Sequence, residues 1–490
     1  MTKFHLWGSS GSTFFEKKRT ENYNQFMSKL TSLIALLIGA LIGLGGFYYS
    51  SFSPVSMSTN YEIIDRVKQN KLDALESHFS SLIAKYHDDP TTEIKLSRQF
   101  DSFANSDPLF EPRLKSWLEK YPDSIAAKLA LAELYLHLGW LSRGTQYISK
   151  THDNQIAAMN QYFEKASQLY LDVLKQEPDL ILPYHGILSI VKTMRNPSLE
   201  AMVTQKAMAV HPESYLFQYQ RLFALQPKWG GSLEAIDEAI KELEPYFSKN
   251  PELELVKAFQ AIAIASEIVR RKKGDESCTT ALSYINKALE KYRTAQLYDN
   301  QGRYHRCLSE YDKAIEAYTQ AIVLQPSTPD YFIGRARNYN SVEKYDEAIA
   351  DINQALHFDT LNPRALRTMG WAYYKQKRYD EAKQAYEKSL IYGEYVHRAH
   401  RMLGYIYFNS TKDYVSAEKS FLKAKEYGDK NPRTTIMLAS AQYRQQDCKY
   451  IPTAEEYLAM CEKNRKCADK YIKWAKNSIK HSRSDGTCPQ

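Results

Sequence analysis

From Tyr61 onward, apolar residues recur at the three- and four-residue spacing of amphipathic helices almost to the end of the chain. No stretch shows the alternation of a half-buried strand. Before Tyr61 the pattern changes, because the twenty residues Leu30–Tyr49 contain no charged side chain. A helix of this length spans a hydrocarbon core of about 30 Å. We therefore predict an all-α chain in which a single transmembrane helix precedes helical domains.

The charges that flank the apolar segment are asymmetric. Lys and Arg cluster in residues 1–29, and none follows the segment until Arg66. The positive-inside rule therefore predicts a cytoplasmic tail at 1–29, a transmembrane helix at 30–49, a linker at 50–60, and the remaining chain outside the cytoplasm of a bacterial inner membrane. A cleaved signal peptide is the alternative, which the long polar lead disfavours. The small residues that would pair two such helices in a homodimer are Ala35, Gly39 and Gly43.

A period of 34 residues begins at Ala295. Small and aromatic residues form columns at this spacing, and a fourth copy follows with a one-residue insertion in its turn. The pattern resembles the tetratricopeptide repeat (TPR), in which small residues lie where two helices cross and aromatic residues fill the space between them. The columns are Gly302, Ala336 and Gly370; His305, Tyr339 and Tyr373; Ala314, Ala348 and Ala382; Tyr318, Ile352 and Tyr386; and Ala321, Ala355 and Ser389.

The resemblance implies a TPR-type α-solenoid, a stack of helix pairs. It places four units at 295–430, a degenerate unit at 251–294, and capping helices with a cysteine-rich tail at 431–490. Residues 61–250 have a less regular helical pattern and resemble an uncharacterised bacterial helical domain family, which implies a TPR-like fold and no mechanism. The runs that carry this second resemblance are Trp117–Pro122–Ser124, Trp140–Arg143–Gly144 and Lys228–Trp229–Gly230–Gly231.

Charge argues against a nucleic-acid partner. The formal net charge is +8, and five basic against two acidic side chains put +3 of it in residues 1–29. The remaining +5 is spread over 461 residues, which is too dilute for the basic footprint of a nucleic-acid-binding protein.

Six cysteines lie beyond the apolar segment, on the side predicted to be outside. An even number in an oxidising compartment indicates disulfides. Zinc is the alternative, but there is no C-x-x-C motif and His481 is the only nearby histidine. In the repeat family the first helices of neighbouring units run parallel, which implies a Cys278–Cys307 disulfide; three pairings stay open for the other four cysteines. These four are Cys448, Cys461, Cys467 and Cys488.

The stretch LQPKWGGSLEA (Leu225–Ala235) invites comparison with an anion-binding loop. Neither a P-loop nor a dinucleotide-loop spacing is present, and no strand precedes it. A turn between two helices accounts for its glycines, and Ser232 is a natural cap for the second helix. Motifs for catalysis are missing as well, so we predict a protein that is not an enzyme, with no catalytic residue, cofactor or metal.

The repeats supply the best functional argument. In the family, the inner concave surface comes mainly from positions 2, 5, 9 and 12 of each first helix. Here these positions are rich in arginine and aromatic residues, which favour binding of an acidic protein or peptide segment. We therefore predict a scaffold that captures such a partner. The predicted groove residues are Arg303, Arg306, Arg337, Asn340, Arg364, Arg367, Trp371, Tyr374, Arg398, Arg401, Tyr405 and Phe408.

Two other functions stay open from the sequence. Residues 61–250 form a ligand-binding or enzymatic module if polar groups converge around Arg143, Lys228 and Trp229. Alternatively, the solenoid binds cell-wall glycan, for which aromatic side chains such as Trp371 and Tyr405 must be exposed in a row.

Overall fold

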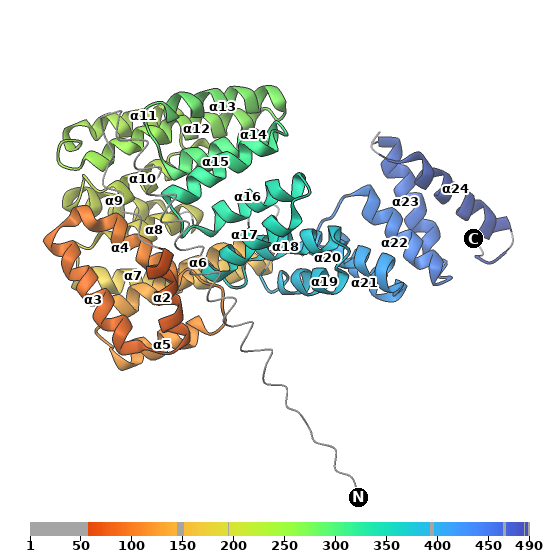
Figure 1. Cartoon of the computed structure of the whole chain (residues 1–490), viewed down its shortest axis with the longest axis horizontal. Coiled ribbons are helices and arrows are strands. Elements are labelled where there is room, and N and C mark those ends of the chain that lie inside the picture. Colours follow the sequence, from red (N-terminus) through yellow and green to blue (C-terminus); the bar gives the residue numbers. More distant parts are fainter. Residues whose placement is uncertain are drawn as a thin grey trace, which may run out of the picture. The chain divides into compact units, whose positions relative to one another are not determined.

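The computed structural model describes residues 57–144, 151–194, 196–392, 396–463, 467–484 and 486–488, and all regular structure in these ranges is helical (Figure 1). The described residues all lie within one compact unit. The helices before the repeats are α2 (Met57–Lys68), α3 (Leu72–Asp88), α4 (Glu93–Phe100), α5 (Phe110–Lys120), α6 (Ile125–Arg143), α7 (Asp153–Gln176), α8 (Ile181–Met194), α9 (Pro197–Val210), α10 (Tyr215–Ala224) and α11 (Leu233–Glu242).

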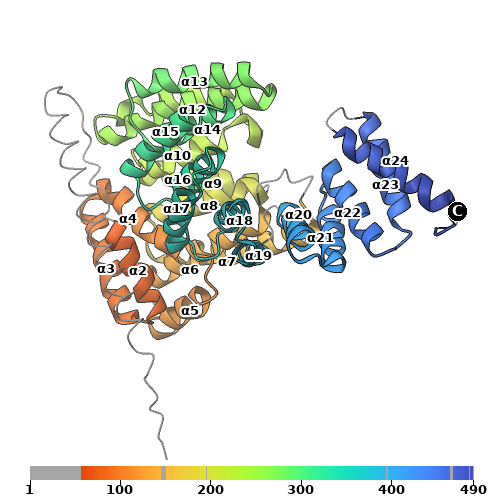
Figure 2. The ribbon, with the colours of Figure 1, turned by 45° about the vertical axis from the view of Figure 1, so that its right-hand side comes forward.

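From residue 256 onward, helices pair regularly, and each packs on the next along the chain (Figure 2). Short 3₁₀ turns, among them η2 (Asp101–Phe103) and η4 (Pro227–Trp229), join the helices α2–α11, which we call the early block. The later helices are α12 (Val256–Arg271), α13 (Asp275–Leu289), α14 (Ala295–Cys307), α15 (Tyr311–Leu324), α16 (Pro329–Ser341), α17 (Tyr345–Phe358), α18 (Pro363–Lys375), α19 (Tyr379–Lys388), α20 (Val396–Ile406), α21 (Tyr414–Glu426), α22 (Pro432–Arg444), α23 (Tyr450–Lys463) and α24 (Asp469–Ser484).

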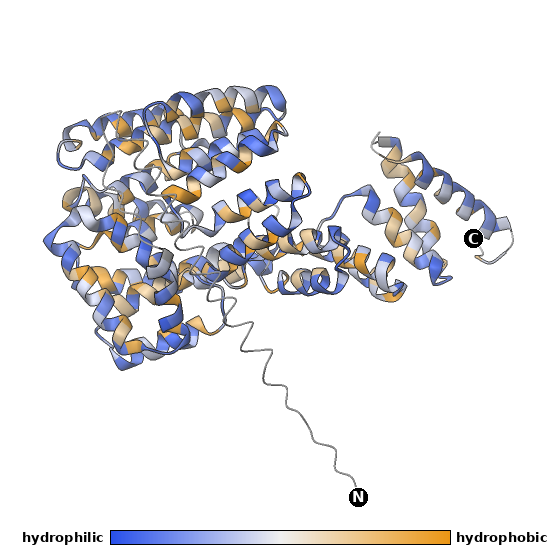
Figure 3. Ribbon diagram, viewed as in Figure 1, coloured by the Kyte–Doolittle hydropathy of each residue, from blue (hydrophilic) through white to orange (hydrophobic). Residues whose placement is uncertain are grey.

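One part of the predicted fold class is corrected. Among the helices of the described ranges, none is both long and apolar enough to cross a bilayer. Hydrophobic and hydrophilic positions alternate along these helices (Figure 3), and many of the hydrophobic residues are buried in the cores. The predicted span Leu30–Tyr49 and its pairing face Ala35, Gly39 and Gly43 lie outside the described residues. The all-α solenoid stands, whereas the single transmembrane helix and the inner-membrane location inferred from it are withdrawn.

The small-residue columns lie where helices touch. An added Cβ would come within 2.7 Å of the Tyr318 ring at Gly302 and within 2.5 Å of the Phe421 ring at Gly404. Real Cβ atoms do not approach rings so closely, so a glycine is needed at these two crossings to let the paired helices meet. The same contact recurs before the repeats, where a Cβ at Gly139 would lie 2.4 Å from Phe163.

The turn inside each helix pair repeats with the sequence. Ser309, Glu343 and Lys377 adopt left-handed φ values of 61°, 62° and 63° and are 34 residues apart. Lys412 follows after 35 residues, because the predicted one-residue insertion is taken up by a π-helical turn at Tyr407–Thr411. Gln446 repeats the turn 34 residues later, between α22 and α23. The helix-pair pattern therefore continues to α23.

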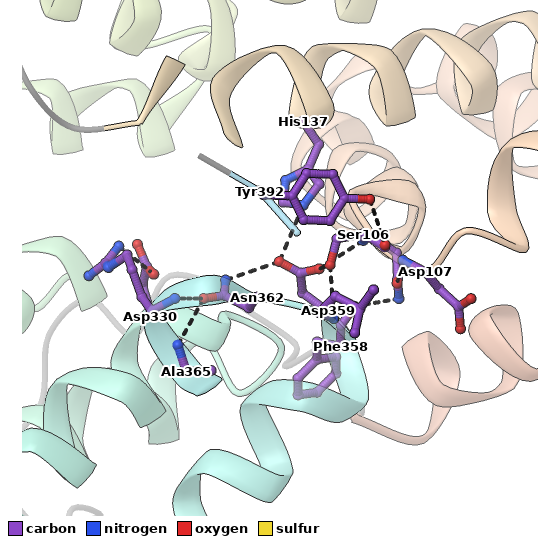
Figure 4. A network of polar contacts seen from close by, with 12 residues as sticks. Ser106, Asp107, His137, Asp330, Phe358, Asp359, Asn362, Ala365 and Tyr392 are labelled. Carbon is purple, nitrogen blue, oxygen red and sulfur yellow. Dashed lines mark hydrogen bonds and ion pairs between the residues drawn. The ribbon is translucent and has the colours of Figure 1, made fainter. Parts of the chain in front are cut away.

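A buried polar contact joins the early block to the repeats (Figure 4). The loop after η2 meets the turn between α17 and α18, 253 residues further along. Asn105 Nδ2 donates to the Phe358 carbonyl at 2.8 Å, and the Ser106 N–H donates to Asp359 Oδ1 at 2.8 Å. The Ser106 hydroxyl also donates to Asp359, and Tyr392 donates to the Ser106 carbonyl at 2.9 Å. We call this the Ser106–Asp359 contact.

The same junction is apolar around its polar centre. One continuous core extends from α2 through α10 and includes Phe332, Ile352 and Met369 of the repeats. Residues from Ala382 onward belong to a second core, which ends at Cys488. Helices α16–α18 of the repeats therefore share a core with the early block, α12–α15 pack in smaller clusters of their own, and the C-terminal part from α19 onward has a separate core.

All six cysteines are paired. Cys278 and Cys307 form the predicted disulfide, with their Cα atoms 6.2 Å apart. In the tail the structure resolves the open choice of pairing: Cys448 bonds Cys488, and Cys461 bonds Cys467. Two of the three disulfides therefore lie in the C-terminal core.

Candidate functional site

The predicted groove residues, which we call the first-helix set, lie on α14, α16, α18, α20 and the π turn that follows α20. Local signals fix where these helices begin. Thr294 Oγ1 accepts the Leu297 N–H at 3.2 Å, and Asn362 Oδ1 accepts the N–H groups of Arg364 and Ala365 at 3.0 Å. Capping of this kind sets the helical register, so the same positions of each helix point the same way.

Several members of the first-helix set are used within the fold. Arg306 Nη1 donates to the Arg337 carbonyl at 2.8 Å and so ties α14 to α16. Asn340 is buried and donates to the Thr368 carbonyl at 3.1 Å, which ties α16 to α18. These contacts hold neighbouring repeats in register, so the side chains of Arg306 and Asn340 have a structural role.

Acidic partners engage three more arginines of the set. Arg303 pairs with Asp299 at 2.9 Å and Arg364 with Asp330 at 2.9 Å. Arg401 lies 3.1 Å from both carboxylate oxygens of Asp429, which is itself buried. Because removing one partner of a buried pair leaves an uncompensated charge, Arg401 has a structural role.

Arg337 differs from these arginines. It is exposed, and in the described part of the chain its guanidinium has no carboxylate partner. Burial lowers its pKa, and the positive charges of Arg306, Arg364 and Arg398 lower it further. Arg337 therefore lies at the centre of an accumulation of positive charge, where an anion is favoured. Arg398 is exposed as well, and Arg367 is half-buried.

The aromatic residues of the first-helix set also include both exposed and packed side chains. Trp371 keeps 40% of its surface exposed and stacks on Tyr374, with ring centroids 6.0 Å apart. Tyr405 is buried against Phe421, and Phe408 packs on Tyr414 with ring centroids 5.3 Å apart. An exposed row from Trp371 to Tyr405, which glycan binding requires, is therefore not formed.

One further residue completes the set. Arg433 begins α22, 35 residues after Arg398, and its guanidinium lies 5.5 Å from the centre of the Tyr405 ring. The 34-residue register with its single insertion carries position 2 of the first helix onto Arg433. The sequence itself therefore carries the signal for this residue.

The stretch Leu225–Ala235 is a junction between α10 and α11, as predicted. Gly230 has a left-handed φ of 91°, and a Cβ at Gly231 would lie 2.0 Å from the Leu225 carbonyl oxygen. Ser232 Oγ accepts the Ala235 N–H at 3.0 Å and caps α11. The glycines and the serine are therefore explained by backbone geometry.

Sequence comparison agrees with the repeat geometry. Two family models, each described as tetratricopeptide repeat, match residues 292–363 and 363–393. Residues 292–393 carry tetratricopeptide repeats. Repeats of this kind bind protein partners and act as interaction scaffolds, and no catalytic family is indicated. No curated protein matches the chain.

Several solved repeat structures are similar to parts of the chain. A structure described as functional characterization of Pseudomonas aeruginosa pilF is 19% identical and covers 45% of this chain and 97% of its own, with a TM-score of 0.39. PilW, a type IV pilus biogenesis factor, is 16% identical and covers 44% and 97%, with a TM-score of 0.38. A tetratricopeptide repeat protein from Parabacteroides merdae is 15% identical and covers 54% and 98%, with a TM-score of 0.36. At these values the likenesses carry no argument about function.

Proposed function

We propose that the chain is a non-catalytic adaptor that binds an acidic segment of a protein partner on the first-helix set. Tetratricopeptide repeats act as protein-interaction scaffolds, which supports the class of function. The single observation that carries the choice of partner is Arg337, an exposed guanidinium without a carboxylate partner among the described residues. It lies within the electrostatic influence of three other arginines.

The chemistry of the face fits an acidic peptide. A guanidinium presents its donors as a planar fork that matches a carboxylate, so unpaired arginines favour Asp and Glu side chains. Trp371, exposed and stacked on Tyr374, offers an apolar surface beside these charges. Arginine and tryptophan are the residue types that most often dominate binding energy at protein interfaces.

Arg337→Glu tests this function. The variant replaces the central positive charge with a negative one, so binding of fluorescein-labelled hexaglutamate should weaken at least about tenfold, equivalent to about 1.4 kcal/mol. Fluorescence anisotropy at low and physiological salt measures the affinity, and far-UV circular dichroism checks that the helices persist.

The matched control is Arg293→Glu, which reverses an exposed arginine outside the first-helix set. It changes net charge by the same amount, so it separates a local site from general attraction. Equal weakening by both variants, or none by Arg337→Glu, would show that the first-helix set is not the binding surface.

A further inference from the structure

A second group of cations gathers where the early block approaches the first repeat. Lys228 from η4 and Arg143 from the end of α6 both lie against the Trp229 ring, at 5.7 and 5.8 Å from its centre, and the charge of Arg303 of α14 acts on Lys228 as well. Among the described residues, Lys228 and Arg143 form no ion pair, and Asp299 is already paired with Arg303. The group therefore holds more positive than negative charge.

Two hydrogen-bond donors at this place are buried and unsatisfied. Arg143 Nε and Trp229 Nε1 have no partner in the described structure. The Arg143 guanidinium lies 5.7 Å from the Trp140 ring and 5.8 Å from the Trp229 ring, so two indoles hold it in place. An unsatisfied buried donor is unfavourable, and an acceptor brought by a ligand would satisfy it.

Lys228 packs against two aromatic rings, although the residue as a whole is exposed. Its Nζ lies 4.3 Å from the centre of the Phe223 ring. Burial lowers the pKa of Lys228 to about 8, with further lowering by the charges of Arg303 and Arg143. The tight turn at Gly230 and Gly231 fixes the backbone beside it. An anion that binds between Lys228, Arg143 and Arg303 would relieve the repulsion among their positive charges.

We propose that Lys228, Arg143 and Arg303 form a carboxylate-binding site that anchors one end of the acidic segment held by the first-helix set. The inference rests on the proposed function and extends it, because two of the three residues come from outside the repeats. Continuity supports this choice of ligand: Arg303 belongs to the first-helix set, and the next first helix carries Arg337. The positive charges at Lys228 therefore continue those of the first-helix set, so one acidic peptide can contact both.

Lys228→Gln tests the site, with fluorescein-labelled hexaglutamate as the probe and fluorescence anisotropy as the measurement. The variant keeps a polar, unbranched side chain but removes the charge, and we expect the affinity to fall five- to tenfold. Lys249→Gln is the matched control, because Lys249 is likewise exposed with its Nζ 5.6 Å from an aromatic ring, that of Tyr246, and is not one of the three cations of the site. The control should bind the peptide like the unaltered protein.

The outcomes separate this inference from the proposed function. Weaker binding in Lys228→Gln and unchanged binding in Lys249→Gln support the anchor site. Weaker binding in Arg337→Glu with unchanged binding in Lys228→Gln overturns the anchor site and leaves the adaptor function in place. If the unaltered protein does not bind hexaglutamate, both proposals fail. If inorganic phosphate, and not hexaglutamate, binds in a Lys228-dependent manner by calorimetry, the site is a phosphate site and the carboxylate assignment is wrong.

Discussion

The two parts of the repeat array are closed off by different means. Helices α16–α18 share a core with the early block and are joined to it by the Ser106–Asp359 contact, which connects residues 253 positions apart. Helices α19–α24 have their own core, and the last of them carry the disulfides Cys448–Cys488 and Cys461–Cys467. A solenoid needs protection at its ends. Here a long-range polar contact protects one part and short covalent loops protect the other.

Of the variants that test this difference, Asp359→Ala should lower stability the most. Asp359 is buried and accepts hydrogen bonds from the N–H and hydroxyl groups of Ser106 and from Asn362. Its removal leaves these donors unsatisfied, so we expect a loss of about 4–5 kcal/mol in the free energy of unfolding, measured by urea denaturation. The first-helix set should then lose its orientation relative to the early block.

Asp312→Ala is the control for Asp359→Ala, because Asp312 is an exposed carboxylate in the first turn of α15. Its loss should change the free energy of unfolding by less than about 0.5 kcal/mol.

The dependence of stability on acid pH is a second test of Asp359. Burial raises the pKa of Asp359, but the charge of His137 and the hydrogen bonds of Ser106 outweigh it, and the pKa is lowered below 3.8. The ionised group therefore stabilises the fold above about pH 4, and this stabilisation is lost as the pH falls further. If the free energy of unfolding of Asp359→Ala falls below pH 4 in the same way as that of the unaltered protein, this assignment is wrong.

Replacing Cys448 and Cys488 together by serine should have the next largest effect. The disulfide closes a loop of 40 residues, for which chain entropy predicts about 3–4 kcal/mol of stabilisation. Because the C-terminal core is separate, the loss should be local. Hydrogen exchange should accelerate in α22–α24 and stay unchanged in α6–α8. Uniform acceleration along the chain would show that the two parts unfold as one.

Gly302→Ala and Gly404→Ala apply the same small change to the α14–α15 pair and to the α20–α21 pair of the C-terminal part. The added Cβ would approach the Tyr318 ring to 2.7 Å and the Phe421 ring to 2.5 Å, respectively. Overpacking of about 2 kcal/mol is offset by about 1 kcal/mol of gained helix propensity, so each variant should lose about 1 kcal/mol. Thermal denaturation measures both. Similar losses would indicate that local packing is equivalent in the two helix pairs, whereas a loss in one alone would place the difference in the repeats themselves.

Features that depend on near neighbours were predictable from the sequence. The 34-residue columns predicted the helix pairs, and the extra residue before Lys412 predicted a disturbed turn, which the structure shows as a π turn. Ser232 was predicted to cap α11 and does so. Helix period, capping and turn geometry are set within a few residues, so a single sequence carries them.

Only the tertiary structure decided which predicted groove residues are engaged. Arg401 pairs with the buried Asp429, whereas Arg337 has no carboxylate partner among the described residues, although both occupy first-helix positions that point the same way. The Ser106–Asp359 contact and the approach of Lys228 to Arg303 were not foreseeable either. Periodicity fixes the direction of a side chain from its helix, but the partner it meets depends on how distant segments fold back on one another. That arrangement is set by the packing of the whole core.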